Sequence, residues 1–74
     1  MATLPNLSGK NVAKAFECVG WTKVRQRGSH MILVKEGSMV TLSVPDHKEV
    51  AKGTLRSLIR ASGLTVDEFI ALNR

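Results

Sequence analysis

Residues 21–44 read WTKVRQRGSHMILVKEGSMVTLSV, and this stretch decides the fold. Apolar and polar side chains alternate along it with the period of two that is typical of β-strands. Two short segments, Gly28-Ser29 and Glu36-Gly37-Ser38, interrupt the alternation and favour tight turns. We therefore predict an antiparallel meander of three strands, over residues 21–27, 30–36 and 39–44.

The first predicted strand carries most of the positive charge of this stretch. A period of two places Lys23, Arg25 and Arg27 on the same side as Trp21, and Val24 on the other. The second strand is more apolar, so we expect it at the centre of the sheet. The pattern thus predicts one basic side at the start of the meander.

Helical patterns lie before and after the meander. The first predicted helix covers residues 9–19, the second covers about residues 52–62 after Pro45 has ended the sheet, and a short last helix follows a capping box. The capping residues are Ser8, Gly20, Gly63, Thr65 and Glu68. The aromatic and aliphatic side chains expected in the core are Phe16, Trp21, Leu55, Leu58, Ile59 and Phe69. The order α-β-β-β-α with a short C-terminal helix predicts an α+β fold whose two main helices cover one face of a three-stranded antiparallel sheet.

The length and the net charge limit the classes of protein to which the chain can belong. Seventy-four residues predict a single domain over residues 1–74. Eleven Lys and Arg against six Asp and Glu give a formal net charge of +5, which favours nucleic acid as a partner. No long apolar run or secretory signal pattern occurs, so we expect no membrane segment and a cytoplasmic location. The single cysteine, Cys18, cannot form an internal disulfide and is expected to be a buried, inert thiol.

The patterns of common metal- and nucleotide-dependent enzymes do not occur. Metal-dependent nucleases need clustered carboxylates to hold Mg²⁺, and the six acids here are scattered. The one adjacent pair, Asp67-Glu68, is explained by its place at a helix start. No phosphate-binding glycine loop, dinucleotide fingerprint or nucleophile elbow is present. We therefore predict neither a metal site nor a cofactor.

His30 follows the predicted turn in a basic neighbourhood. Nearby cations favour the neutral form of an imidazole, which can accept a proton from a hydroxyl. The same cations would hold a phosphodiester and neutralise the charge that develops on its oxygens. These groups suit metal-independent RNA cleavage, in which a ribose 2′-hydroxyl attacks its own phosphate. The alternative is a strand histidine that contacts a ligand without chemistry.

A second histidine, His47, lies in a polar loop beside Asp46 and Lys48. It could orient the substrate or act as a second acid or base. The alternative is a solvated loop histidine that satisfies a nearby backbone group.

Eight cations are candidates for binding a nucleic-acid backbone. Those of the first helix lie four residues apart, and those around the second helix follow the same spacing, starting at a helix N-terminus that suits phosphate. Few acids compensate them, although a solvated helix face remains the alternative. The candidates are Lys10, Lys14, Lys23, Arg25, Arg27, Lys48, Lys52 and Arg56.

Two motifs of the sequence resemble the HicA toxin family, also called YcfA-like. The first is RQRGSH at residues 25–30, which an apolar strand follows. The second is VPDHK at residues 44–48, which continues through GTLRSLIR at residues 53–60 to Gly63-Leu64. The resemblance covers nearly the whole chain, and both motifs stand in the expected order and spacing.

The resemblance implies a small toxin that cleaves mRNA and that a HicB-type antitoxin neutralises. It also implies that His30 is the catalytic histidine, in the position of the Gly28-Ser29-His30 motif, and that the antitoxin covers this basic surface. Gly28, Ser29 and His47 are the candidate supporting residues. Two hypotheses without chemistry stay open, namely a double-stranded-RNA-binding module and an interaction protein whose basic face serves an acidic partner.

The resemblance further implies a fold similar to that of double-stranded-RNA-binding domains. Such domains contact RNA through the first helix, the loop after the first strand and the N-terminus of the last main helix. In this chain those places hold cations or the histidine turn: Lys10 and Lys14, then Gly28-Ser29-His30, then Lys48 and Lys52.

Overall fold

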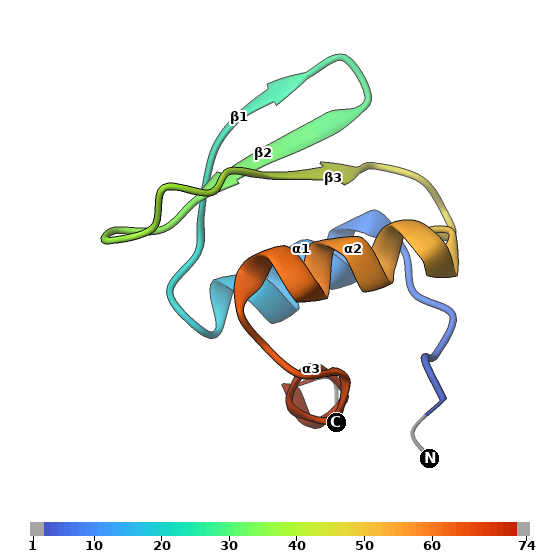
Figure 1. The fold of residues 1–74 in the computed structure, drawn as a ribbon. Helices are drawn as coiled ribbons and strands as arrows, with labels where there is room; N and C mark the ends of the chain where they lie inside the picture. Colours follow the sequence, from blue (N-terminus) through green and yellow to red (C-terminus); the bar gives the residue numbers. More distant parts are fainter. Residues whose placement is uncertain (1–2, 73–74) are drawn as a thin grey trace.

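Three antiparallel strands form one sheet in the order β1-β2-β3, with one helix before it and two after it in the described part of the chain (Figure 1). The computed structural model describes residues 3–72, so the ends of the predicted 1–74 domain, residues 1–2 and 73–74, lie outside the described residues. The elements are α1 (Gly9–Glu17), β1 (Thr22–Arg27), β2 (His30–Val34), β3 (Leu42–Pro45), α2 (Lys52–Ser62) and α3 (Val66–Leu72). The predicted α+β fold and its order of elements are confirmed.

The helix ends lie close to where the capping residues predicted them, except that α1 ends at Glu17 with Cys18 as its C-cap, so the predicted stop at Gly20 is wrong. The hydroxyl of Ser8 accepts from the amide of Asn11 (3.2 Å) at the start of α1. Gly63 ends α2 with a left-handed φ of 87°. The capping box of α3 is formed both ways, because the Thr65 amide donates to the Glu68 carboxylate (2.8 Å) and the Glu68 amide donates to the Thr65 hydroxyl (3.1 Å). Within residues 3–72 no helix has the length and apolar character that crossing a bilayer requires.

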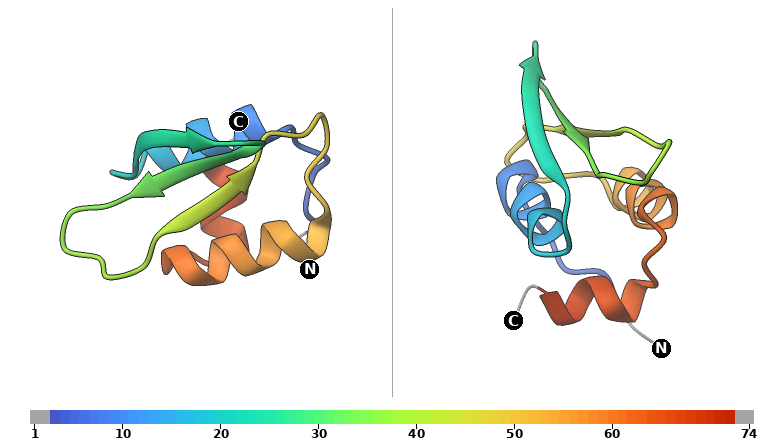
Figure 2. Two further views of the ribbon diagram at one scale, coloured as in Figure 1. Left: turned by 90° about the horizontal axis from the view of Figure 1, so that it is seen from above. Right: turned by 90° about the vertical axis from the view of Figure 1, so that its left-hand side faces the viewer.

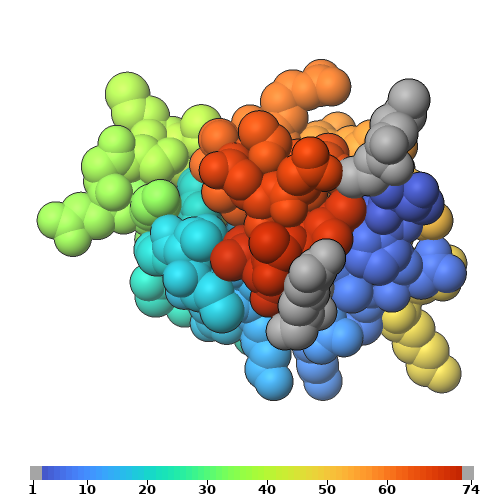
Figure 3. Space-filling view, turned by 90° about the horizontal axis from the view of Figure 1, so that it is seen from below, coloured from blue at the N-terminus to red at the C-terminus, as the bar shows by residue number. Residues whose placement is uncertain are grey.

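Both main helices pack on one face of the sheet, which leaves the other face open (Figure 2, right). α3 lies beyond them on the side away from the sheet, and a view from below shows it covering the bottom of the molecule (Figure 3). The three predicted aromatic core residues are buried and in contact: Phe16 meets Trp21 at a centroid distance of 6.5 Å and Phe69 at 5.2 Å. The predicted apolar stripe of α2 is also buried; its members are Leu55, Leu58 and Ile59.

A β-bulge in β1 corrects the predicted arrangement of its cations. Lys23 pairs with Leu33 of β2, but the next pair is Arg25 with Ile32, so Val24 is the extra residue. Leu33 is buried under the helices, which places Lys23 on the covered face. The extra residue reverses the alternation, so Arg25 lies on the open face. The prediction that the cations of β1 share one side is therefore wrong.

The bounds of β2 and β3 also differ from the predicted ones. β3 begins only at Leu42, because a local turn occupies the residues before it: the Ser38 amide donates to the Lys35 carbonyl (3.0 Å), and the Ser38 hydroxyl accepts from the Val40 amide (3.1 Å). Such local bonds compete with the strand ladder. β2 ends at Val34, before the predicted end at residue 36.

Cys18 forms the C-cap of α1 and is exposed, so the predicted burial of its thiol is wrong.

Replacing Gly9 by alanine is expected to destabilise the fold, because α1 begins against the backbone at the end of β3. A Cβ at this position would collide with the carbonyl of Pro45 and lie 2.9 Å from the Cα of Asp46. Backbone cannot move aside as a flexible side chain can, so we expect a loss of about 1–3 kcal/mol in the free energy of unfolding, measured by urea titration. Gly53→Ala is the matched control, since a Cβ at this helical position meets nothing within 4 Å and should raise stability slightly. Equal stability of Gly9→Ala and the unsubstituted protein would contradict the close approach.

Candidate functional site

The two sequence motifs meet at one corner of the molecule, where β1 turns into β2 and β3 ends. The backbone amide of Asp46 donates to the carbonyl of Ser29 (2.6 Å), which joins the loop after β3 to the β1–β2 turn. The amide of Gly9 donates to the carbonyl of His47 (2.9 Å), which adds the start of α1 to the same corner. Segments that lie far apart in the sequence are thus held together by main-chain hydrogen bonds.

His30 is the first residue of β2 and is exposed at this corner. It pairs with Arg27 across the turn and with Pro45 of β3. Because Met31 is buried under the helices, the alternation of the strand places the His30 side chain on the open face. Arg27 is directly opposite and shares that face, and Arg25 follows it on the same side. An accessible imidazole therefore lies beside two guanidinium-bearing residues.

The turn before His30 depends on a glycine. Gly28 has a φ of 59°, in the left-handed region that side chains with a Cβ rarely adopt. Ser29 follows it, and its backbone carbonyl accepts a hydrogen bond from the amide of Asp46. The predicted supporting pair thus shapes the turn through its backbone.

The second histidine is in a different position. His47 is exposed in the loop after β3, and its backbone carbonyl accepts from the amide of Gly9. Within residues 3–72 no hydrogen bond joins its side chain to that of His30. Its contact with α1 is made by the main chain, so the structure gives the imidazole of His47 no fixed partner in the described part of the chain.

One polar side chain at the corner was not singled out by the sequence reasoning. The side-chain amide of Gln26 donates to the carbonyl of Gly28 (3.3 Å) and to the carboxylate of Asp46 (3.3 Å). Its oxygen accepts from the ammonium of Lys23 (3.2 Å). We call the two bonds donated by Gln26 the Gln26 clasp. A neutral amide carries no charge signal, so the only hint in the sequence was its place inside the RQRGSH motif.

Three of the predicted RNA-binding lysines gather in one groove. Lys10 and Lys14 of α1 and Lys23 of β1 line a shallow groove of about 260 Å³ between the helix and the covered side of β1. The acids Glu17 and Asp46 lie on its wall as well. The bulge brings Lys23 into this groove and keeps Arg25 and Arg27 out of it. The cations of β1 thus serve two surfaces that meet along this strand.

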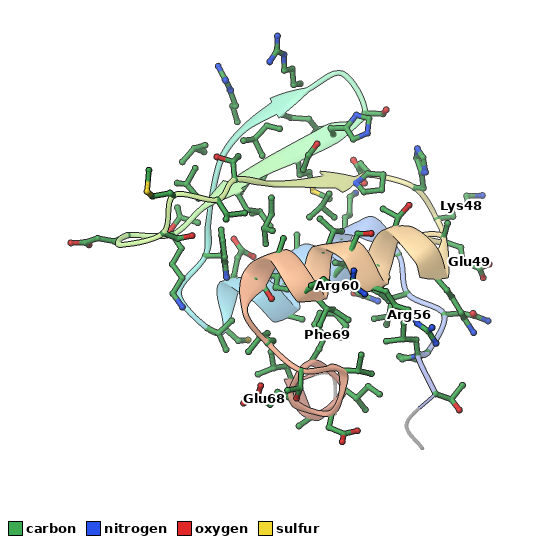
Figure 4. The ribbon with its side chains drawn as sticks, viewed as in Figure 1. Lys48, Glu49, Arg56, Arg60, Glu68 and Phe69 are labelled. Carbon is green, nitrogen blue, oxygen red and sulfur yellow. The ribbon has the colours of Figure 1, made fainter. Side chains whose placement is uncertain are left out.

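Of the predicted cations around α2, Arg56 does not share a surface with His30. Lys48 lies in the loop before α2, and Lys52 is its first residue (Figure 4). Arg56 instead lines a separate groove of about 310 Å³ with Arg60 and residues 64–66 at the start of α3. Because α3 lies on the far side of the helices from the sheet, Arg56 is separated from the histidine corner (Figures 1 and 4).

Both main helices have a lysine in the first turn, where a carboxylate would be more stabilising. Neither α1 nor α2 has an acid in its first turn, although Lys10 and Lys52 lie there. The positive end of the helix dipole disfavours a cation at this position and favours an anion. At α2 the N-cap is Ala51, which offers no side-chain hydrogen bond to the free backbone amides. A bound phosphate would satisfy both the amides and the lysine.

Residues 3–72 contain no group of three or more His, Cys, Asp or Glu side chains able to hold a metal ion. The polar groups near His30 are the guanidinium groups of Arg25 and Arg27, the Ser29 hydroxyl and backbone amides, with the single carboxylate of Asp46 on the adjoining loop. Such a set binds and polarises a phosphate group through hydrogen bonds and positive charge.

Comparison with known proteins identifies the class to which this small α+β domain belongs. The model of the family described as the HicA toxin of bacterial toxin–antitoxin systems matches residues 9–64, which include both motifs and all of α1, the sheet and α2. A solved structure described as a toxin–antitoxin complex from Streptococcus pneumoniae contains a chain with a similar fold, with a TM-score of 0.70 and 30% sequence identity. The match covers 78% of this chain and 98% of that chain. No curated protein matches the sequence.

The chain belongs to the HicA toxin family. It is thus a toxin of the toxin–antitoxin class, as the resemblance of its two motifs implied. The family match ends at residue 64, so α3 (Val66–Leu72) lies outside it.

Proposed function

We propose that the protein is a metal-independent endoribonuclease in which His30 is the general base. The observation that carries the proposal is the exposed imidazole on the open sheet face, with Arg25 and Arg27 on the same face and no carboxylate paired opposite it in the sheet. A base of this kind accepts the proton of a ribose 2′-hydroxyl. Family membership supports an activity on RNA but does not by itself assign a residue to it.

The chemistry uses groups that the RNA itself supplies. As His30 removes the proton, the 2′-oxygen attacks the adjacent phosphorus and the bond to the 5′-oxygen breaks. The leaving oxygen takes a proton from the imidazolium or from water, and the product carries a 2′,3′-cyclic phosphate and a 5′-hydroxyl. Arg27 and Arg25 would stabilise the charge that develops on the phosphoryl oxygens.

The arrangement of cations supports binding of a folded or double-stranded RNA segment. Lys10, Lys14 and Lys23 line the α1–β1 groove on one side of β1, and the arginines lie on the other side. Lys48 and Lys52 extend the positive surface to the N-terminus of α2. Lys10 and Lys14, the Gly28-Ser29-His30 turn, and Lys48 and Lys52 would correspond to the three RNA-contacting places of double-stranded-RNA-binding domains, which recognise shape and phosphate. The aromatic residues Phe16, Trp21 and Phe69 are all buried, so none is free to stack on bases.

A HicB-type antitoxin is the proposed protein partner. The solved relative is described as part of a toxin–antitoxin complex, and a surface with net charge +5 suits an acidic partner. A partner that covers the open sheet face would exclude RNA from His30. Neutralisation would then follow from simple occlusion.

The test is a cleavage assay on a long RNA in EDTA, with analysis of the product ends. We expect fragments that carry 2′,3′-cyclic phosphate, and the rate should not depend on added Mg²⁺. Intact RNA that is retarded in a gel would contradict the proposal in favour of a binding module without chemistry. Absence of both cleavage and salt-sensitive binding would favour a protein whose basic surface serves only another protein.

A further inference from the structure

The turn that carries His30 is connected by a side chain to a distant part of the chain. Gln26 is exposed, yet its amide makes both bonds of the clasp, at 3.3 Å to the Gly28 carbonyl and 3.3 Å to the Asp46 carboxylate. Gly28 is in a left-handed conformation two residues before the histidine. Asp46 lies twenty residues from Gln26 in the sequence. The clasp thus joins the turn to the loop after β3.

A backbone hydrogen bond also joins the loop after β3 to the β1–β2 turn. The backbone amide of Asp46 donates to the Ser29 carbonyl at 2.6 Å, so the residue that accepts from Gln26 also holds the position just before His30. A two-residue turn with exposed side chains has little packing to fix it. Polar contacts from two directions therefore hold this turn, in addition to the ladder pairs of His30 with Arg27 and Pro45.

From this geometry we infer that Gln26 is a positioning residue for His30, acting through Gly28 and Asp46. The inference rests on the proposed function, because positioning matters only where His30 must meet a 2′-hydroxyl. A general base acts within hydrogen-bond reach of its proton, and a displacement of about 1 Å can cost up to about 10²-fold in rate. Gln26 lies on the covered face of β1, opposite Met31, so it does not share the open face with the imidazole.

Two substitutions of Gln26 separate positioning from charge. Gln26→Met keeps the length of the side chain and removes both donors, and Gln26→Glu keeps the oxygen that faces Lys23 but loses the donors. Both variants are expected to lower kcat by about tenfold or more. KM should change by less than about twofold in Gln26→Met, whereas Gln26→Glu should also raise KM because its carboxylate lies in the groove lined by lysines. Ser57→Ala is the matched control, because it removes one exposed side-chain bond to the backbone (Ser57 to Gly53, 3.1 Å) on α2 and should leave kcat unchanged.

Two substitutions of Asp46 test its part in the clasp, one that keeps the acceptor oxygen and one that removes it. Asp46→Asn keeps an acceptor oxygen for the Gln26 amide and should retain most of kcat. Asp46→Ala removes one of the two acceptors and should lower kcat, by no more than Gln26→Met does. The double variant Gln26→Met/Asp46→Ala should be no slower than Gln26→Met alone, because the bond lost in Asp46→Ala is one of the two lost in Gln26→Met.

The decisive comparison uses a background without the imidazole. In His30→Ala protein, Gln26→Met should leave the residual rate unchanged, because nothing remains to be positioned. A tenfold drop in that background would overturn the inference and assign Gln26 a direct contact with RNA. Unchanged kcat for Gln26→Met in the otherwise native protein would overturn it as well.

Amide hydrogen exchange gives a readout that needs no activity. The Asp46 amide should be protected in the native protein and should exchange faster in Gln26→Met, while the amides of α2 keep their protection. Unchanged exchange at Asp46 would contradict the clasp. If the native protein fails to cleave RNA in EDTA, the proposed function falls and the positioning role with it. If the native protein cleaves and the variants cleave equally well, only the positioning role falls.

Discussion

His30→Ala protein should bind RNA as tightly as the unsubstituted protein and cleave it at least about 10²-fold more slowly. The reason is that a positioned acid–base group contributes about 10²–10⁴-fold to a proton transfer, whereas the neighbouring cations hold the phosphate. His30 is exposed at the first position of β2, so its loss removes little packing. The measurement is the single-turnover cleavage rate in EDTA, with affinity determined separately by gel retardation.

The control for this experiment lies at the other end of the sheet. Met39 is fully exposed in the β2–β3 loop, so Met39→Ala removes an exposed side chain without approaching the histidine corner. We expect its cleavage rate and affinity to match those of the unsubstituted protein. Cleavage by His30→Ala at the native rate would require another residue to act as the base. Loss of RNA binding together with cleavage would mean that His30 contributes to affinity rather than to the chemical step.

Phe16→Ala should cost about 3–5 kcal/mol in the free energy of unfolding. Phe16 is fully buried on α1 and meets Trp21 before β1 and Phe69 on α3. Its ring therefore connects three segments around one point, and its removal leaves a cavity in the core. A chain of this size has only a few kcal/mol of stability, so a large fraction of the variant should be unfolded at 37 °C.

The only tryptophan provides the signal for this measurement. Trp21 is buried, so its fluorescence reports unfolding in a urea titration. Val24→Ala serves as the control, because Val24 is 53% exposed in the bulge and should change stability by less than about 0.5 kcal/mol. A Phe16→Ala midpoint close to the native one would contradict the expected contribution of this ring to stability.

The helices could be predicted from the sequence because their ends are specified locally. Ser8, Gly63 and the Thr65–Glu68 pair each act within a few residues, and the structure contains all of these caps. The strands are determined by contacts between segments. The bulge at Val24 depends on how β1 pairs with β2, and alternation along β1 alone could not reveal it.

The candidate site was predicted in part for the same reason. The sequence placed His30 directly after a glycine turn, and the structure has it there. It could not show that Arg56 faces a groove beside α3, because a four-residue spacing on a helix does not say what packs next to it. Gln26 was missed since one of its two acceptors, Asp46, lies in the other motif, and only the folded chain brings it to Gln26.

The bulge also bears on how the sheet meets other copies of the same chain. The outermost strands of an open sheet present unpaired backbone groups that can template the addition of a foreign strand, which is a common route to aggregation. Here one outermost strand is interrupted at Val24, and the other is the four-residue β3, which ends in Pro45 and its missing N–H. Neither offers a long regular ladder. A small domain can therefore keep one sheet face uncovered for a ligand while discouraging strand exchange between molecules.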